Sequence, residues 1–245
     1  MKKGWKIEKL SELCTVFDDG DWIERKDQSN NGIRLIQTGN IGIGFFKDRV
    51  EKARYISEDT FRKLKCTEIF KNDCLISRLP DPVGRACILP DTGNKMITAV
   101  DCTIIRFDEK KVISKWFLFY SLSERYQTEI NEQISGATRQ RISRKNLGQI
   151  KIPLVALSEQ KHIVAILDEV FADIEKAKNN AEQNLKNSKE LFESYLQGVF
   201  EKRDEGWETK KLTELFNVQS SKRVHKKDWK NKGVPFYRAR EVVKL

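Results

Sequence analysis

The stretch Leu157–Phe200 reads LSEQKHIVAILDEVFADIEKAKNNAEQNLKNSKELFESYLQGVF, and it decides how the chain is organised. It contains no proline, and its single glycine is Gly198, so nothing in it stops a helix before the last turn. A helix from Ser158 to Phe200 would be about 65 Å long at about 1.5 Å per residue. That is longer than a compact domain of this size needs, and we therefore predict a helical spacer.

Apolar or small residues recur along this stretch at spacings that alternate between four and three. One additional spacing of four between Ala177 and Leu185 interrupts the alternation, which is a stutter in a heptad repeat. A seam of this kind predicts that the helix pairs with a second helix as a coiled coil. The residues expected at the pairing interface are Ile163, Leu167, Val170, Ile174, Leu185, Phe192, Tyr195 and Val199.

Residues 1–155, ahead of the helix, predict a mixed α+β domain. The expected strands are rich in Ile, Val, Cys and Thr; they are Ile33–Thr38, Cys74–Arg78, Gly84–Leu89 and Ile97–Phe107. Serine followed by acidic residues predicts a short helix at Ser57–Lys65, and helical spacing of aromatic residues predicts another at Ser114–Ile134. Pro153 is expected to end the last strand, and Ser158 with Glu159 to cap the long helix.

After the helix, the sequence begins again. GWETKKLTEL from Gly206 repeats GWKIEKLSEL from Gly4, and VPFYRAREVV from Val234 occupies the place of IRLIQTGNIG from Ile33. A period of roughly two hundred residues is too long for a solenoid and indicates a duplicated unit of domain plus helix. The expected organisation is therefore a domain at 1–155, a helix at 156–203 and the start of a second domain at 204–245.

Composition points to a polyanionic partner. The formal net charge is +10, which favours association with anions such as nucleic acids. The five cysteines form no CxxC pair, as expected for reduced thiols of a cytoplasmic protein. The N-terminus has acidic residues where a signal peptide would be apolar, and no stretch approaches a membrane span. The expectation is a soluble protein without a membrane partner.

These segments together are similar to the DNA specificity subunits of type I restriction-modification systems. The resemblance rests on the long-helix sequence, on the preceding SGATRQRISRKNLGQIKIPL from Ser135, and on the GW..KKL.EL restart. It implies target recognition domains that alternate with helices, each domain reading half of a bipartite double-stranded DNA site. It also implies a non-catalytic chain without a cofactor, whose helices bind methyltransferase subunits, with restriction subunits joining that core.

The resemblance implies two helices packed antiparallel, whereas this sequence contains one. A lone amphipathic helix would leave its apolar seam in water, which is unfavourable over this length. We therefore expect a homodimer in which two copies pair their helices antiparallel, giving a twofold-symmetric reader of a split palindromic site.

Candidate DNA contacts are polar side chains expected on loops next to strand ends. Arg, Asn and Gln can pair with base edges in the major groove, and Arg or Lys can bind phosphates. Between Ser135 and Leu157 the basic residues are not offset by an acid, so Arg139–Lys145 is expected to contact the backbone, with base reading by Gln37, Asn40 and Arg78. The full set of candidates is Gln37, Thr38, Asn40, Ser77, Arg78, Arg139, Gln140, Arg141, Arg144 and Lys145.

Two alternatives stay open. Asp91, followed by Asp108 and Lys110, imitates the carboxylate and Asp-x-Lys pattern of a small metal-dependent DNA nuclease. The chain could also be a structural coiled-coil interaction protein whose charge is incidental. Because His162 and His225 are isolated and far from any cysteine, no metal site is expected from them.

Overall fold

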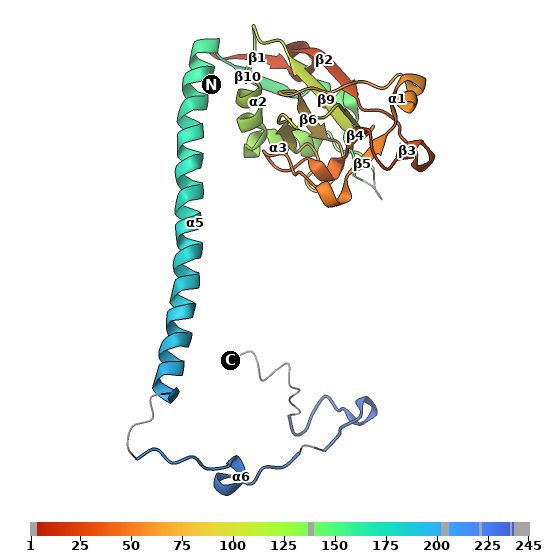
Figure 1. Ribbon diagram of the computed structural model, residues 1–245. Helices are drawn as coiled ribbons and strands as arrows, with labels where there is room; N and C mark the ends of the chain where they lie inside the picture. Colours follow the sequence, from red (N-terminus) through yellow and green to blue (C-terminus); the bar gives the residue numbers. More distant parts are fainter. Residues whose placement is uncertain (1–3, 137–139, 202–205, 221, 236, 238–245) are drawn as a thin grey trace. The chain divides into compact units, whose positions relative to one another are not determined.

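The structure is a computed structural model that describes residues 4–136, 140–201, 206–220, 222–235 and 237 (Figure 1). The chain divides into two compact units, Met1–Asn180 and Ala181–Leu245. The first of these, called the N-terminal unit below, contains all three sheets found in the described part of the chain.

The three sheets differ in size and pairing. One is the antiparallel ribbon β1–β10, one has the order β2–β9–β6–β7, and one has the order β3–β5–β4–β8, in which β4 and β8 are parallel. The strands are β1 (Lys6–Lys9), β2 (Cys14–Asp19), β3 (Gln28–Ser29), β4 (Ile33–Ile36), β5 (Arg54–Ile56), β6 (Cys74–Ser77), β7 (Ala86–Ile88), β8 (Met96–Thr98), β9 (Cys102–Phe107) and β10 (Lys151–Leu154).

Helices and short 3-10 turns lie between these strands and after the last of them. The α-helices are α1 (Glu58–Leu64), α2 (Ser114–Ser121), α3 (Glu124–Glu132), α4 (Arg144–Gly148), α5 (Leu157–Glu201) and α6 (Leu212–Leu215). The 3-10 turns are η1 (Leu10–Leu13), η2 (Arg25–Asp27), η3 (Thr38–Asn40), η4 (Val50–Lys52) and η5 (Lys226–Asp228). The mixed α+β class with a long helix, predicted from the sequence, is confirmed.

The largest apolar core lies where α2 and α3 pack on the β2–β9–β6–β7 sheet. β6 is buried along its whole length, as a strand covered on both faces must be. Tyr126 of α3 is fully buried, its ring meets that of Phe117 edge-on at 5.9 Å, and its hydroxyl donates to the carbonyl oxygen of Gly84 at 2.9 Å. This hydrogen bond satisfies the buried phenol and ties α3 to the turn between β6 and β7.

Two of the predicted elements are each divided in the structure. Ile97–Phe107 is not one strand, because the chain turns after Thr98 and continues in a different sheet as β9. Ser114–Ile134 is not one helix, because Ser123 caps a new helix by accepting a hydrogen bond from the backbone N–H of Tyr126 at 3.3 Å. The short helix predicted at Ser57–Lys65 is confirmed as α1.

The transition into the long helix also differs from expectation. Pro153 lies within β10 rather than after it, opposite Ile7, where the ribbon tolerates a residue without a backbone N–H. Helix α5 begins at Leu157, so Ser158 lies inside the helix and is not its cap. The helix itself is confirmed and spans 45 residues.

The first turns of α5 are fastened to the N-terminal unit. The fully buried side chain of Gln160 accepts a hydrogen bond from the N–H of Ile113 at 3.1 Å and donates to the carbonyl oxygens of Lys111 and Val155, both at 2.9 Å. About three turns further on, the Phe171 ring stacks on Phe119 of α2 at 5.4 Å. The first part of the helix is therefore held against the domain.

Beyond these contacts the predicted seam is largely exposed. Ile163 and Leu167 are partly buried near the domain, whereas Ile174 is 55% exposed and Phe192 is 67% exposed. The other predicted seam residues are exposed as well: Val170, Leu185, Tyr195 and Val199. An apolar stripe of this length is the face that a second helix would cover.

The repeated motif has different surroundings in its two occurrences. Leu10 and Leu13 are fully buried in the core of the N-terminal unit, while Leu212 and Leu215 of α6 are 68% and 55% exposed. Both pairs lie in a short helical turn flanked by extended backbone. The local conformation is therefore repeated without the apolar cover.

The five cysteines are free; four of them are buried and Cys14 is partly buried, which limits the reactivity of their thiols. Burial raises the pKa of Cys87 and Cys102 to about 12, which leaves a thiolate fraction on the order of 10⁻⁴ at pH 8. We therefore expect a maleimide to modify the folded chain slowly and all five thiols rapidly in guanidinium, counted by mass spectrometry. Rapid labelling of Cys87 or Cys102 in the folded chain would contradict this.

Within the described residues, no helix is both long and apolar enough to cross a membrane.

Candidate nucleic-acid interface

The turn after β4 contains three of the predicted DNA contacts, and it uses one of them for its own structure. Asn40 is only 8% exposed. Its Oδ1 accepts a hydrogen bond from the N–H of Gln37 at 3.0 Å, and its Nδ2 donates to the carbonyl oxygen of Lys47 at 2.9 Å. Asn40 is therefore not the exposed loop side chain that the prediction of base reading requires, whereas Gln37 and Thr38 remain partly exposed.

Ser77 and Arg78 are interior residues rather than exposed loop residues. Ser77 lies in β6, is fully buried, and donates its hydroxyl to the carbonyl oxygen of Leu79 at 3.0 Å. Arg78 is 2% exposed, with its Nη2 donating to Val100 O at 2.6 Å and its Nε 3.2 Å from Asp19. Burial lowers the pKa of this guanidinium, which Asp19 partly offsets. Arg78 therefore braces β6 against its neighbours, and its expected place on the surface is wrong.

The basic segment before β10 is not electrostatically uncompensated. Arg144 is ion-paired with Asp18, and Arg141 lies 3.4 Å from Asp101. The aspartates come from the end of β2 and from the turn before β9, far away in sequence. The expectation of a basic loop without acidic neighbours is therefore wrong for these two arginines. Gln140 and Lys145 are exposed, and Arg139 lies outside the described residues.

A more strongly basic surface lies elsewhere, in a hollow of about 630 Å³ beside the turn after β4. We call it the basic hollow; it is lined by Gln37, Thr38, Gly39, Asn40, Arg49, Lys52, Ala53 and Arg54. No carboxylate is among these lining residues. Among the ion pairs of the described residues, none involves Arg49, Lys52 or Arg54, so three cations face one concave surface without a paired acid.

A buried arginine is hydrogen-bonded to the turn that lines the basic hollow. Arg85 is 7% exposed, and its guanidinium donates to the carbonyl oxygens of Thr38 and Ile41 at 2.9 and 2.8 Å. It also donates to those of Leu79 and Pro82 at 2.7 and 2.9 Å. Burial lowers the pKa of Arg85, yet four carbonyl dipoles solvate the charge. Arg85 thus holds two loops in one arrangement.

Gly39 makes room for one of the cations. A Cβ at position 39 would collide with Nη1 of Arg49, so only glycine lets this guanidinium lie against the turn. Arg49, Lys52 and Arg54 were not identified from the sequence, because Asp48 and Glu51 alternate with them along the chain. The usable signal was the excess of basic residues in KDRVEKAR from Lys47.

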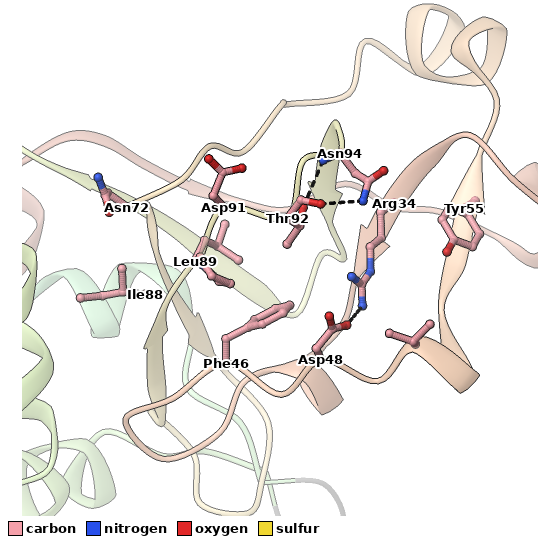
Figure 2. Close-up of a pocket in the computed structure, with 12 residues that line it drawn as sticks. Arg34, Phe46, Asp48, Tyr55, Asn72, Ile88, Leu89, Asp91, Thr92 and Asn94 are labelled. Carbon is pink, nitrogen blue, oxygen red and sulfur yellow. Dashed lines mark hydrogen bonds and ion pairs between the residues drawn. The ribbon is translucent and has the colours of Figure 1, made fainter. Parts of the chain in front are cut away.

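A second, larger hollow adjoins the same segment and has a different charge balance. Its volume is about 830 Å³, and Figure 2 shows Arg34 within it directed at Asp48, with which it is ion-paired. Asp91 also lines it, and apolar contacts come from Phe46 and Leu89. With two carboxylates and a neutralised arginine, this hollow is a poor site for a phosphate.

The two aspartates of the nuclease alternative lie in separate turns, and each is hydrogen-bonded within its own turn. Asp91 accepts a hydrogen bond from the N–H of Gly93, and Asp108 accepts one from the N–H of Lys110, each at 3.0 Å. The strands that precede the two aspartates, β7 and β9, are separated by β6. In the part of the chain that the structure describes, no three His, Cys, Asp or Glu residues are grouped so that they could hold a metal ion.

Comparison with known proteins places the chain in a family. The family model described as the type I restriction modification DNA specificity domain matches residues 2–183. The chain therefore belongs to this family.

Similar curated proteins have the same description. The chain is 27% identical over 198 residues to the type I restriction enzyme MjaVIII specificity subunit of Methanocaldococcus jannaschii, covering 79% of this chain and 46% of that protein. It is 29% identical over 182 residues to the EcoBI specificity subunit of Escherichia coli, covering 73% and 37%. The chain thus spans less than half the length of these relatives.

Two solved structures share the fold. One, from a study of complex assembly and conformational transition of the type I R-M system, matches with a TM-score of 0.63 at 22% identity, covering 82% of this chain and 46% of that one. The other, the HsdS subunit from Thermoanaerobacter tengcongensis, matches with a TM-score of 0.53 at 22% identity, covering 71% and 39%.

Proposed function

We propose that the N-terminal unit recognises a sequence in double-stranded DNA as the specificity component of a type I restriction-modification complex. The observation that carries this proposal is the family match over residues 2–183, which includes every element that builds the unit's sheets. The net charge of +10 and the basic hollow are consistent with a DNA partner. The unit would read one half of a bipartite site.

The proposed role is positioning rather than chemistry. The chain selects the site and holds methyltransferase subunits over the target, and those subunits perform base flipping and methyl transfer. Methyltransferase subunits would dock along α5, and restriction subunits would join this assembly. Two copies would pair α5 antiparallel, which covers the exposed seam and gives a twofold-symmetric reader.

Within this proposal, the exposed candidates divide between base reading and backbone contact. Gln37 and Thr38 can offer paired donors and acceptors to a base edge, as can Gln140. Lys145, which is exposed, can bind a phosphate. Arg141 and Arg144 could join it only by exchanging their aspartate partners for DNA, which reduces the net gain from those contacts.

We expect Gln37→Ala to relax the preference at one base position, by about 1–3 kcal/mol of discrimination, while Lys145→Ala weakens all duplexes evenly. The measurement is selection from a randomised duplex library by the chain together with methyltransferase subunits, followed by affinities at several salt concentrations. Unselected duplexes and single strands are the controls. Equal affinity for all duplexes, or a preference for single strands, would contradict the proposed function.

A further inference from the structure

We propose that the basic hollow is a binding site for backbone phosphates of duplex DNA, with Arg49, Lys52 and Arg54 as the groups that contact them. This inference rests on the proposed function only in that the ligand is DNA. The basic hollow is a second phosphate-binding site, separate from the basic segment near Lys145.

The first observation that supports this site is the positive charge of the basic hollow. Three cations lie on a stretch of six residues that contains η4, and they line one concavity with no carboxylate among its lining residues. A concave surface lined by one sign of charge concentrates its field and attracts an oppositely charged ligand. Arg and Lys bind phosphate oxygens through several N–H donors, so a phosphate is the group that this lining fits.

Neither acid of this stretch lines the basic hollow: Glu51 of η4 is exposed and is not among the lining residues, and Asp48 is directed elsewhere. Asp48 precedes Arg49 in the chain, yet it lines the other hollow and pairs there with Arg34, as Figure 2 shows. Arg34 is buried, so it holds this carboxylate from inside the domain. The result is a separation of charge across η4, with an acid-containing hollow on one side and an acid-free hollow on the other.

Arg85 holds the turn that lines the basic hollow and places a further positive charge beside it. Arg85 ties the carbonyls of Thr38 and Ile41 to the loop containing Leu79 and Pro82. Its positive charge is solvated by these carbonyl dipoles, and none of these bonds is to a carboxylate, so the charge is retained. A pre-organised surface loses less entropy when a phosphate binds, which favours use of the hollow as a contact point.

Three single substitutions test the charges. Arg49→Ala, Lys52→Ala and Arg54→Ala are each expected to weaken binding of a 30-base-pair duplex by about tenfold at low salt and to reduce the slope of log K against log salt by about 1. Matched controls are Lys161→Ala, Lys176→Ala and Lys189→Ala, which remove exposed cations from α5. These controls should leave the slope unchanged.

Gly39→Ala tests the geometry without altering charge. The added methyl group should displace the flexible end of Arg49, so we expect a loss of affinity smaller than that of Arg49→Ala, which also removes the charge. Gly198→Ala is the matched control, because a Cβ there meets open space. Circular dichroism would verify that each variant remains folded.

The outcomes separate this inference from the proposed function. If the three alanine variants keep the parental slope, the hollow does not contact phosphates. Sequence selection could still be intact in that case, and the proposed function would stand. If the parent chain binds no DNA at all, both proposals fail.

Discussion

Replacing Gln160 with leucine is expected to lower the free energy of unfolding of the N-terminal unit by about 3 kcal/mol. The side chain is fully buried, and it satisfies the N–H of Ile113 and the carbonyl oxygens of Lys111 and Val155. Leucine has a similar size but removes the partner of all three backbone groups, which are partly buried, and a polar group left unpaired in the interior costs about 1–3 kcal/mol. The measurement is urea unfolding followed by tryptophan fluorescence.

The matched control for this substitution is Gln183→Leu. Gln183 lies on the same helix but is exposed, and its side chain bonds only to Asn187 at 2.7 Å. Its replacement should change stability by less than about 0.5 kcal/mol. Equal effects of the two substitutions would show that Gln160 does not fasten α5 to the domain. A specific effect would mean that the hydrogen bonds of Gln160 hold the first turns of α5 against the domain.

The double substitution Ile174→Glu and Phe192→Glu is expected to convert the proposed homodimer into monomers. Each of these apolar side chains contributes about 1.5–3 kcal/mol when it is buried, and a symmetric dimer contains four of them. A loss of about 6 kcal/mol raises the dissociation constant on the order of 10⁴-fold. Sedimentation equilibrium at micromolar concentrations measures this directly.

Ala172→Glu with Ser194→Glu provides the control, because both positions are exposed and lie away from the seam. The control adds the same charge to the helix and should leave the dimer intact. Two results would oppose the proposal: a parent chain that is monomeric at micromolar concentration, or a control that dissociates as readily as the seam variant.

The long helix shows what local sequence can predict. Its backbone hydrogen bonds join residues four apart, so a stretch without proline and with regular spacing contains almost all the information that specifies it. The same holds for α1, where Ser57 accepts from the N–H of Thr60 at 3.1 Å. Boundaries were less predictable, since the turn after Thr98 and the cap at Ser123 divide segments whose composition is continuous.

The DNA candidates show where local sequence is insufficient. Asn40 and Arg78 have side chains suited to base reading, but the fold uses both internally, and this depends on partners such as Lys47 and Val100. The roles of such side chains follow from which donors and acceptors the fold brings within about 3 Å of them. A sequence pattern contains the residue types but not these distances.

The sequence by itself determined the α+β domain, the long helix with its seam and the repeat of the opening motif, because each depends on propensity and periodicity along the chain. Only the tertiary structure decided where the unpaired positive charge lies. It brought Asp18 to Arg144 and turned Asp48 towards Arg34, leaving Arg49 without an acid. Coulomb interactions act through space rather than along the chain, so charge balance at a surface is known only once the fold is known.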